Sequence, residues 1–283
     1  MFAPPEPEVT AAFARDGYVI LRDVLNPTLR QRLAETSRAL LASGQTAGRD
    51  LGADGKDGFR GCVGLDQAFL PLVANPCVLP TLVALLSPNI HLLSSHLIAL
   101  PSVPPDGLRT IRIPERPGWH RDMFGVASDL GDDRIPRMAI KCAYYLSDLR
   151  HDCGLTMFLP GSHTLTAPPE IPAGGIDPPG AITPDLGPCD AVLFENRTWH
   201  AGGVNTSGRT RLAIMMQYGY RWLARVDDPT PHLLHAPSLD PIQRQLLGEP
   251  DRAADGSLAK GSGAAPLRRL WTHRAARPDV ASA

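Results

Sequence analysis

The chain has 283 residues, of which 43% are hydrophobic and 20% are charged, and its formal net charge at pH 7 is −1. A chain of this length can bury a substantial core, and its balanced charge argues against general nucleic-acid binding, which needs a basic face. No run approaches the roughly 18 apolar residues of a membrane span, no signal peptide is recognisable, and the five cysteines form no CxxC pair, so we expect a reduced, cytoplasmic protein.

The first hundred residues are predicted to alternate between helices and strands. Asn26 is a good N-cap, and Pro27 suits the first position of a helix. Gly44 is a good C-terminal stop, so we expect a helix between these signals. Similar patterns predict helices over residues 8–16 and 76–86 and strands over residues 18–21 and 90–100.

Residues 44–66 are glycine-rich and polar, and the sequence leaves two interpretations of them open. The first is a solvated loop. The second is a mobile lid over an active site, because long ordered loops are often functional.

The second half of the chain is predicted to be mainly β-structure. Short apolar segments between Pro- and Gly-rich turns, in a chain with 29 prolines and 26 glycines, favour a sandwich or barrel over a helical bundle. The expected elements are strands over residues 138–146, 155–159, 191–194 and 212–218 and a helix over 241–247. No domain boundary is recognisable, so we expect one domain over residues 1–283, with a core at about 10–222 and a C-terminal extension at 223–283.

His120 and Asp122 form the first candidate metal motif. Residues two apart in an extended segment point to the same face, so these side chains could bind one ion side by side. Far downstream, His200 is a candidate third ligand. Two histidines and one carboxylate on one face of an octahedral ion, with the other positions open, are typical of non-haem Fe(II) oxygenases.

Basic residues near these motifs suggest where an anionic cosubstrate could bind. A 2-oxo acid that chelates iron leaves its far carboxylate free, and a guanidinium suits it because it can donate two hydrogen bonds. Arg209 and Arg211 both follow His200 and are two residues apart, so in an extended strand their side chains would point to the same side. The alternation of side chains along a strand therefore does not show which of them binds the carboxylate. Lys141 is unusual in an apolar strand and is either exposed or directed into the site. His163, in a Pro-Gly-Ser-His turn, is expected to be structural.

Several further motifs occur in an order that resembles a known family. They are residues 13–25, His120-x-Asp122, residues 145–148, 154–163 and 190–194, His200, residues 205–207 and Arg211. Over about residues 10–222 the chain thus resembles the phytanoyl-CoA dioxygenase (PhyH) family of Fe(II)/2-oxoglutarate-dependent oxygenases.

The resemblance implies a mainly β fold with flanking helices: a double-stranded β-helix, or cupin-like jelly roll. It implies that His120, Asp122 and His200 are the iron ligands. It also implies that Arg211 pairs with the far carboxylate of 2-oxoglutarate and that Thr156 hydrogen-bonds this cosubstrate. Related halogenases have a small residue in place of the carboxylate ligand, so Asp122 argues against halogenation.

The expected activity is that of a dioxygenase that uses Fe(II), 2-oxoglutarate and O2 to hydroxylate an unactivated C–H bond of a small organic molecule in natural-product or secondary metabolism. Desaturation, cyclisation or epimerisation by the same chemistry is an alternative. So are a hydrolase or isomerase that uses another divalent ion, and a non-catalytic jelly-roll protein that binds a ligand.

The substrate pocket is the least defined part of the prediction. The candidates lie near the ligands in sequence and combine apolar with cationic side chains, which suits a medium-sized organic molecule with an acceptor group. They are Arg112, Arg116, Met123, Phe124 and Trp199. Arg112 and Arg116 are equally consistent with salt-bridged surface residues. The sequence does not indicate the substrate or the oligomeric state.

Overall fold

The computed structural model describes residues 4–44, 57–104, 112–115, 117–147, 149, 152–227, 233, 236–252, 255–257 and 266–268. Residues 45–56, which make up about half of the segment left open as a loop or a lid, lie outside the described residues. So does Arg116, one of the substrate candidates.

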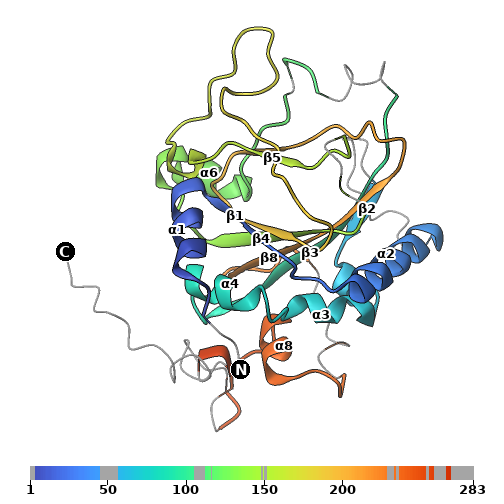
Figure 1. The fold of residues 1–283 in the computed structure, drawn as a ribbon. Coiled ribbons are helices and arrows are strands. Elements are labelled where there is room, and N and C mark those ends of the chain that lie inside the picture. Colours follow the sequence, from blue (N-terminus) through green and yellow to red (C-terminus); the bar gives the residue numbers. More distant parts are fainter. Residues whose placement is uncertain are drawn as a thin grey trace.

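A six-stranded antiparallel sheet forms the centre of the molecule, with the strand order β1-β6-β4-β8-β3-β2 (Figure 1). Its strands are β1 (Tyr18–Leu21), β2 (Asp57–Arg60), β3 (Ile90–Leu100), β4 (Ala139–Tyr145), β6 (Ala191–Glu195) and β8 (Arg211–Tyr220). Strands far apart in the sequence are neighbours, because β1 pairs with β6 and β3 pairs with β8.

A smaller antiparallel sheet faces the large one. It contains β5 (Thr156–Phe158) and β7 (His200–Gly202), and isolated bridges extend it to His120 on one side and Ile182 on the other. Buried side chains fill the space between the two sheets, including Tyr145 and Phe158, both 0% exposed. Two facing antiparallel sheets of this kind form a jelly roll, which confirms the predicted fold class.

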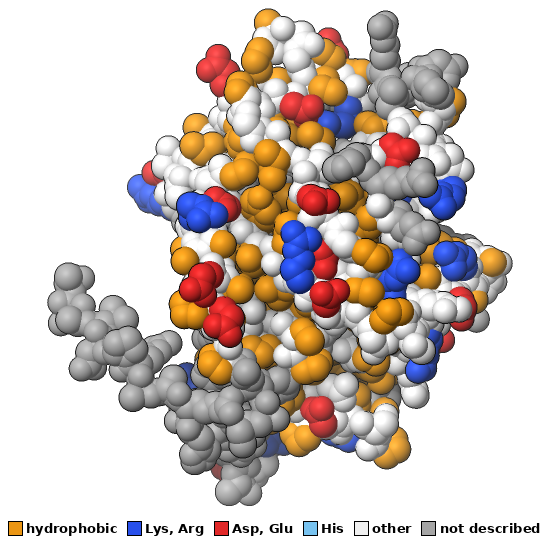
Figure 2. Space-filling view, in the orientation of Figure 1, with side chains coloured by type: hydrophobic (Ala, Val, Ile, Leu, Met, Phe, Trp, Pro, Cys, Tyr) orange, Lys and Arg blue, Asp and Glu red, His pale blue; other side chains and the backbone are white. Residues whose placement is uncertain are grey.

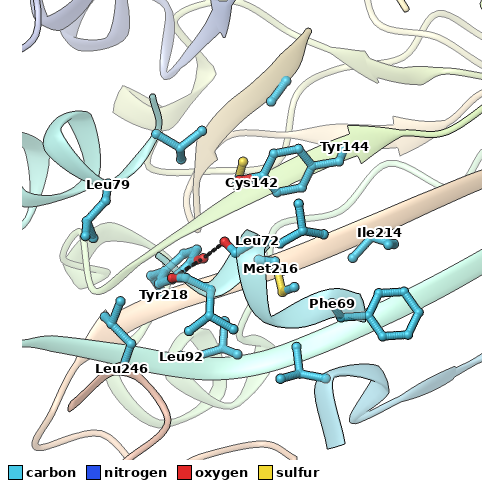
Figure 3. Close-up of a cluster of buried hydrophobic side chains, with 14 of the residues drawn as sticks. Phe69, Leu72, Leu79, Leu92, Cys142, Tyr144, Ile214, Met216, Tyr218 and Leu246 are labelled. Atoms are coloured by element: carbon cyan, nitrogen blue, oxygen red, sulfur yellow. Dashed lines mark hydrogen bonds between the residues drawn. The ribbon is translucent and has the colours of Figure 1, made fainter. Parts of the chain in front are cut away.

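Helices cover the other face of the large sheet (Figure 1). The α-helices are α1 (Pro7–Asp16), α2 (Pro27–Ala42), α3 (Leu70–Val73), α4 (Leu79–Leu85), α6 (Phe124–Leu130) and α8 (Pro241–Leu246), and the 3-10 helices are η1 (Cys62–Gly64), η2 (Gln67–Phe69), η4 (Asp132–Arg134) and η5 (Ser162–Thr164). The main core lies between the sheet and the group formed by α1, α2, α3, α4, α8, η1 and η2, and in it the Tyr218 hydroxyl donates to the carbonyls of Leu72 and Val73 (Figure 3). Leu246 and Leu267 belong to the same core, so described parts of the C-terminal extension pack with the rest of the chain.

The predicted helix boundaries agree with those in the structure where the local sequence signals are strong. The Asn26 side chain accepts a hydrogen bond from the Leu29 amide, so it caps α2 as expected. The helix predicted over residues 76–86 is shorter, because residues 76–78 form a turn before α4.

The region expected to be a loop at 44–66 contains a strand. β2 pairs with β3 at the edge of the large sheet, and a Cβ atom on Gly58 would lie 2.1 Å from the Leu97 carbonyl oxygen. The glycine therefore permits a close approach between two backbones, which polar, glycine-rich sequence does not reveal by itself.

Acidic and basic side chains are interspersed on the face shown in Figure 2, in keeping with the near-zero net charge. Among the described residues, no helix combines the length and apolar character that crossing a membrane requires.

Candidate metal centre

His120, Asp122 and His200 meet at one point on the inner side of the small sheet. One ligand atom from each can be chosen so that all lie within 4.8 Å of one another. The His200 Nε2 atom is 3.9 Å from Asp122 Oδ1, and the two imidazole centroids are 4.2 Å apart. The structure therefore brings together the three residues that the sequence pattern singled out.

Backbone pairing fixes the two histidines relative to each other. The amide of His120 donates to the carbonyl of His200 at 2.9 Å, and the amide of His200 donates back at 3.0 Å. Each Nδ1 atom lies 2.9 Å from a backbone carbonyl, that of Gly118 for His120 and that of Thr198 for His200. A proton on Nδ1 satisfies that carbonyl and leaves the Nε2 lone pair for a metal ion.

Asp122 is ionised, and in the part of the chain that the structure describes only one of its two carboxylate oxygens has a hydrogen-bond partner. Lys141 donates to Oδ1 at 2.8 Å, whereas Oδ2 is buried without a hydrogen-bond partner among the described residues. Burial by itself would raise the pKa of Asp122, but Lys141, His200 and His120 together outweigh it and lower the pKa to about 2. Burial, followed by repulsion from His120, lowers the pKa of His200 to about 3, so its imidazole is neutral at pH 7.

This donor set fits a divalent transition metal. Two neutral imidazoles and one carboxylate converge, and an orphaned carboxylate oxygen is available. Such a set suits Fe(II) with further coordination positions open.

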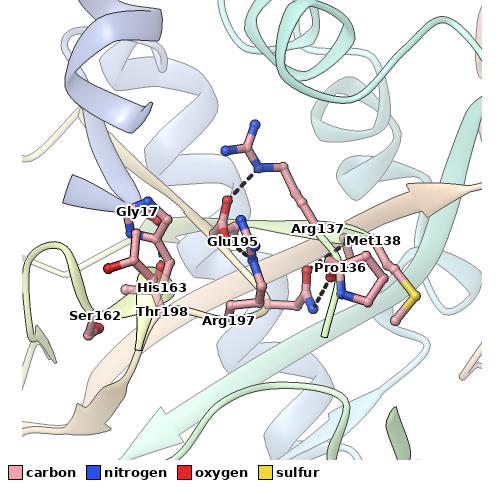
Figure 4. A network of polar contacts seen from close by, with 12 residues as sticks. Gly17, Pro136, Arg137, Met138, Ser162, His163, Glu195, Arg197 and Thr198 are labelled. Carbon is pink, nitrogen blue, oxygen red and sulfur yellow. Dashed lines mark hydrogen bonds and ion pairs between the residues drawn. The ribbon is translucent and has the colours of Figure 1, made fainter. Parts of the chain in front are cut away.

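A buried polar network holds the turn that precedes His200 (Figure 4). Glu195, which is fully buried, pairs with Arg137 and Arg197. The Thr198 hydroxyl donates to the Gly17 carbonyl at 2.7 Å, which ties the turn to the segment between α1 and β1. His163 lies here, with Nε2 3.1 Å from the Ala14 carbonyl, in the structural role that the sequence indicated.

Aromatic rings close one side of the site. Phe194 lies 4.8 Å from the His200 ring, and Phe158 lies 5.1 Å from Phe194, while Tyr18 stacks on Phe158 at 4.9 Å. This packed wall fixes the orientation of His200 and keeps water from that side.

Arg211 supplies a buried cation on the same face of the large sheet. Its side chain is 3% exposed, and Nε and Nη1 have no hydrogen-bond partner among the described residues. The guanidinium carbon is 5.4 Å from the Tyr145 ring, and the Tyr145 hydroxyl donates to Thr156 Oγ1 at 2.9 Å. A buried charge without a counter-ion is costly, so this arrangement favours an anionic ligand. The Thr156 hydroxyl proton remains available for another acceptor.

The structure also gives the positions of two further basic residues that the sequence left open. Arg209 is exposed in the loop before β8, which separates it from Arg211. Lys141 points into the site toward Asp122, one of the two alternatives that its sequence context allowed.

The candidate substrate residues that the structure describes have different surroundings. Met123 follows Asp122 in a left-handed backbone conformation, with φ of 61°. It is the N-cap of α6, which begins at Phe124, and the side chain of Phe124 is not described. The Trp199 ring lies 5.1 Å from the Arg121 guanidinium carbon, and strand alternation directs Arg121 away from His120 and Asp122. Trp199 is therefore on the outer face of the small sheet, not on the pocket wall that we expected.

Arg112 has a structural position. It is 8% exposed, and it donates to the Pro117 carbonyl at 2.7 Å and to Asp177 at 2.6 Å. Trp119 also donates to Asp177, so these contacts support the segment that leads into His120. Arg112 is neither a free pocket cation nor a surface residue.

Tyr145 is the site residue that the sequence analysis missed. The sequence did contain a signal for it. Lys141 and Tyr145 are four residues apart on one strand, so their side chains point to the same face, and a lysine directed into the site predicts that the tyrosine is directed there too.

Comparison with known proteins identifies relatives of this chain. An uncharacterized protein of Mycobacterium tuberculosis is 26% identical over 239 residues, which cover 82% of each chain. The dioxygenase cdmA of Talaromyces verruculosus is 32% identical over 81 residues, which cover 29% of this chain and 26% of cdmA.

Solved structures with the same fold include two with bound iron. EctD from S. alaskensis with bound Fe has a TM-score of 0.61 at 21% identity, covering 80% of this chain and 83% of EctD. The epimerase SnoN in complex with Fe3+, alpha ketoglutarate and nogalamycin RO has a TM-score of 0.59 at 20% identity, covering 90% of this chain and 95% of SnoN. The family model for phytanoyl-CoA dioxygenase (PhyH) matches residues 13–213. The chain therefore belongs to the phytanoyl-CoA dioxygenase (PhyH) family.

Proposed function

We propose that this protein is an Fe(II)/2-oxoglutarate-dependent dioxygenase that hydroxylates an unactivated C–H bond of a small organic molecule. The observation that carries the proposal is the convergence of His120, Asp122 and His200 on one point beside an orphaned carboxylate oxygen. Family membership and the iron and alpha ketoglutarate bound in SnoN support the same choice of metal and cosubstrate.

In this proposal the three ligands would hold Fe(II) through their two imidazoles and the carboxylate of Asp122. Bound there, the ion would supply dioxygen activation coupled to the conversion of 2-oxoglutarate to succinate and CO2, with the second oxygen atom entering the substrate. The backbone carbonyls of Gly118 and Thr198 keep both imidazoles in the tautomer that ligation needs.

Arg211 and Thr156 bind the cosubstrate in the same proposal. The guanidinium of Arg211 is buried, lacks a counter-ion among the described residues and is on the metal face, so it suits the far carboxylate of 2-oxoglutarate. The free proton of the Thr156 hydroxyl suits an oxygen of the same molecule. Tyr145 positions both, because its ring lies beside Arg211 and its hydroxyl contacts Thr156.

The test is succinate formation from 2-oxoglutarate by the purified protein with Fe(II) and O2. We expect turnover, coupled or uncoupled to a substrate, that requires all three components and is lost in His200→Ala. His91→Ala is the matched control, because His91 is a buried histidine that belongs neither to the ligand set nor to the network around the turn before His200. Failure of the wild type to bind iron or form succinate would contradict the proposal. Product analysis with a true substrate then distinguishes hydroxylation from the other outcomes.

A further inference from the structure

Lys141 has an unusual position for a lysine. It lies in the middle of β4 between the fully buried Ile140 and Cys142, and its side chain is only 17% exposed. Charged side chains are rarely buried unless they are paired. Its ion-pair partner is Asp122, whose side chain is 12% exposed and belongs to a different segment of the chain.

The strand and its neighbours fix the place of the ammonium group independently of Asp122. Lys141 pairs in register with Phe194 on β6 and Gln217 on β8, in the centre of the large sheet. Its Nζ atom is 5.6 Å from the centroid of Phe194, and that ring also packs on His200 at 4.8 Å. One aromatic ring thus supports both the ammonium group and a metal-site imidazole.

The two oxygens of Asp122 are in different situations. Oδ1 accepts from Lys141 at 2.8 Å, whereas Oδ2 is buried and has no partner among the described residues. Lys141 therefore fixes one edge of the carboxylate, which lies beside the imidazole of His200. A carboxylate held in this way keeps its orientation toward the two imidazoles, whereas a carboxylate without this contact can turn away from them.

We propose that Lys141 is a positioning residue that holds Oδ1 of Asp122 and so keeps this carboxylate oriented toward His120 and His200 for metal binding. This inference rests on the proposed function, because it concerns the same metal site. Hydrogen-bonding partners of metal ligands typically change metal affinity by about 10- to 100-fold when they are removed.

Removing Lys141 has two opposing effects on metal affinity, and a pair of substitutions separates them. Loss of a nearby positive charge favours a cation, whereas loss of the hydrogen bond frees the carboxylate. Lys141→Gln removes the charge but keeps a donor, and Lys141→Met removes both. If positioning dominates, Lys141→Met binds metal at least about tenfold more weakly than the wild type, and Lys141→Gln does not.

The experiment titrates Mn(II) into the metal-free full-length protein by calorimetry, without cosubstrate, and records the Co(II) absorption spectrum as a report of ligand geometry. The matched control is Arg221→Met, which breaks an ion pair with Asp251 of similar exposure outside the metal site. We expect a weaker Mn(II) affinity and an altered Co(II) spectrum for Lys141→Met, and wild-type behaviour for Lys141→Gln and Arg221→Met.

An Mn(II) affinity of Lys141→Met equal to or tighter than that of the wild type would overturn the inference. If Lys141→Met does not fold, Lys141→Thr replaces it, because threonine suits a strand and is too short to reach Asp122. A wild-type protein that binds no Mn(II) would instead overturn the proposed function and this inference with it. Succinate formation by the wild type, measured separately, keeps the two failures distinct.

Discussion

Arg209 and Arg211 have the same charge and the same strand parity, and the structure separates them by burial. Arg211 is 3% exposed in β8, whereas Arg209 is exposed in the preceding loop. The alternation of side chains along a strand could not distinguish the two arginines, because their burial depends on where the strand begins and on which segments cover it. The resemblance to a family favoured Arg211, and its burial beside Tyr145 gives that choice a physical reason.

We expect Arg211→Met to raise the 2-oxoglutarate concentration needed for half-maximal turnover by about tenfold to a hundredfold, because hydrogen bonds to charged groups contribute about 1.5–3 kcal/mol. Without cosubstrate, the variant should be at least as stable as the wild type, because a buried charge without a partner is removed. Steady-state kinetics and thermal melting measure the two effects.

Arg209→Met is the control for this substitution. It removes a guanidinium two residues away, and we expect wild-type affinity for 2-oxoglutarate. Equal weakening in both variants would contradict the role of Arg211.

At the scale of elements, the turn before His200 depends on the end of α1. Gly17 ends that helix with φ of 78°, and a Cβ atom there would lie 2.5 Å from Thr198 Oγ1 and 2.6 Å from His163 Nδ1. Figure 4 shows these side chains around Gly17. The glycine thus allows β1 to approach the segment that carries the metal ligand.

Gly17→Ala should lower the free energy of unfolding by more than the roughly 1–3 kcal/mol that left-handed strain alone costs. It should also weaken metal binding, because Thr198 must move and its carbonyl holds His200. Urea denaturation and metal titration test both effects. Gly44→Ala is the matched control, since φ there is 68° but no atom of the described residues lies within 4 Å of the added Cβ. Equal losses in the two variants would show that crowding at Gly17 is unimportant.

The sequence predicted the elements whose signals are local. The cap at Asn26, the glycine after α1 and the long apolar run of β3 are all encoded within a few residues. The elements that it missed depend on distant segments. β7 has three residues and exists because it pairs with β5 and His120, and β2 exists because it pairs with β3. Tertiary pairing, not propensity, determines such strands.

At the scale of the whole molecule, a buried histidine far from the metal ligands in sequence has an ionisation that opposes folding. His91 on β3 is 6% exposed, and its Nε2 has no partner among the described residues. Burial, with repulsion from Arg225 and Arg221, lowers its pKa to about 4, against about 6.5 for an exposed histidine.

Between these two pH values the unfolded chain binds a proton that the folded chain does not bind. The free energy of unfolding therefore falls as the pH is lowered from about 6.5 to 4, by up to about 3 kcal/mol from this group. His91→Gln cannot titrate, so we expect it to lose less stability than the wild type over that interval and to run parallel to it above pH 7. Urea midpoints at pH 7.5 and pH 4.5 measure the difference, and identical pH dependence in the two proteins would refute the assignment to His91.

The metal centre shows how far sequence reasoning reaches at this scale. The spacing of His120 and Asp122 indicated a shared face, but nothing local placed His200 beside them. Their meeting depends on the pairing of two remote segments of the small sheet, which only the ordered family motifs could anticipate. Trp199 shows the limit of sequence proximity, because its position next to His200 puts its side chain on the opposite face.

The most direct test of the account is an anaerobic crystal structure of the protein with Fe(II) and 2-oxoglutarate. We expect one anomalous iron peak bonded to His120, Asp122 and His200, with the far carboxylate of 2-oxoglutarate on Arg211. Iron at another place, or Arg211 turned away from a bound cosubstrate, would contradict the account.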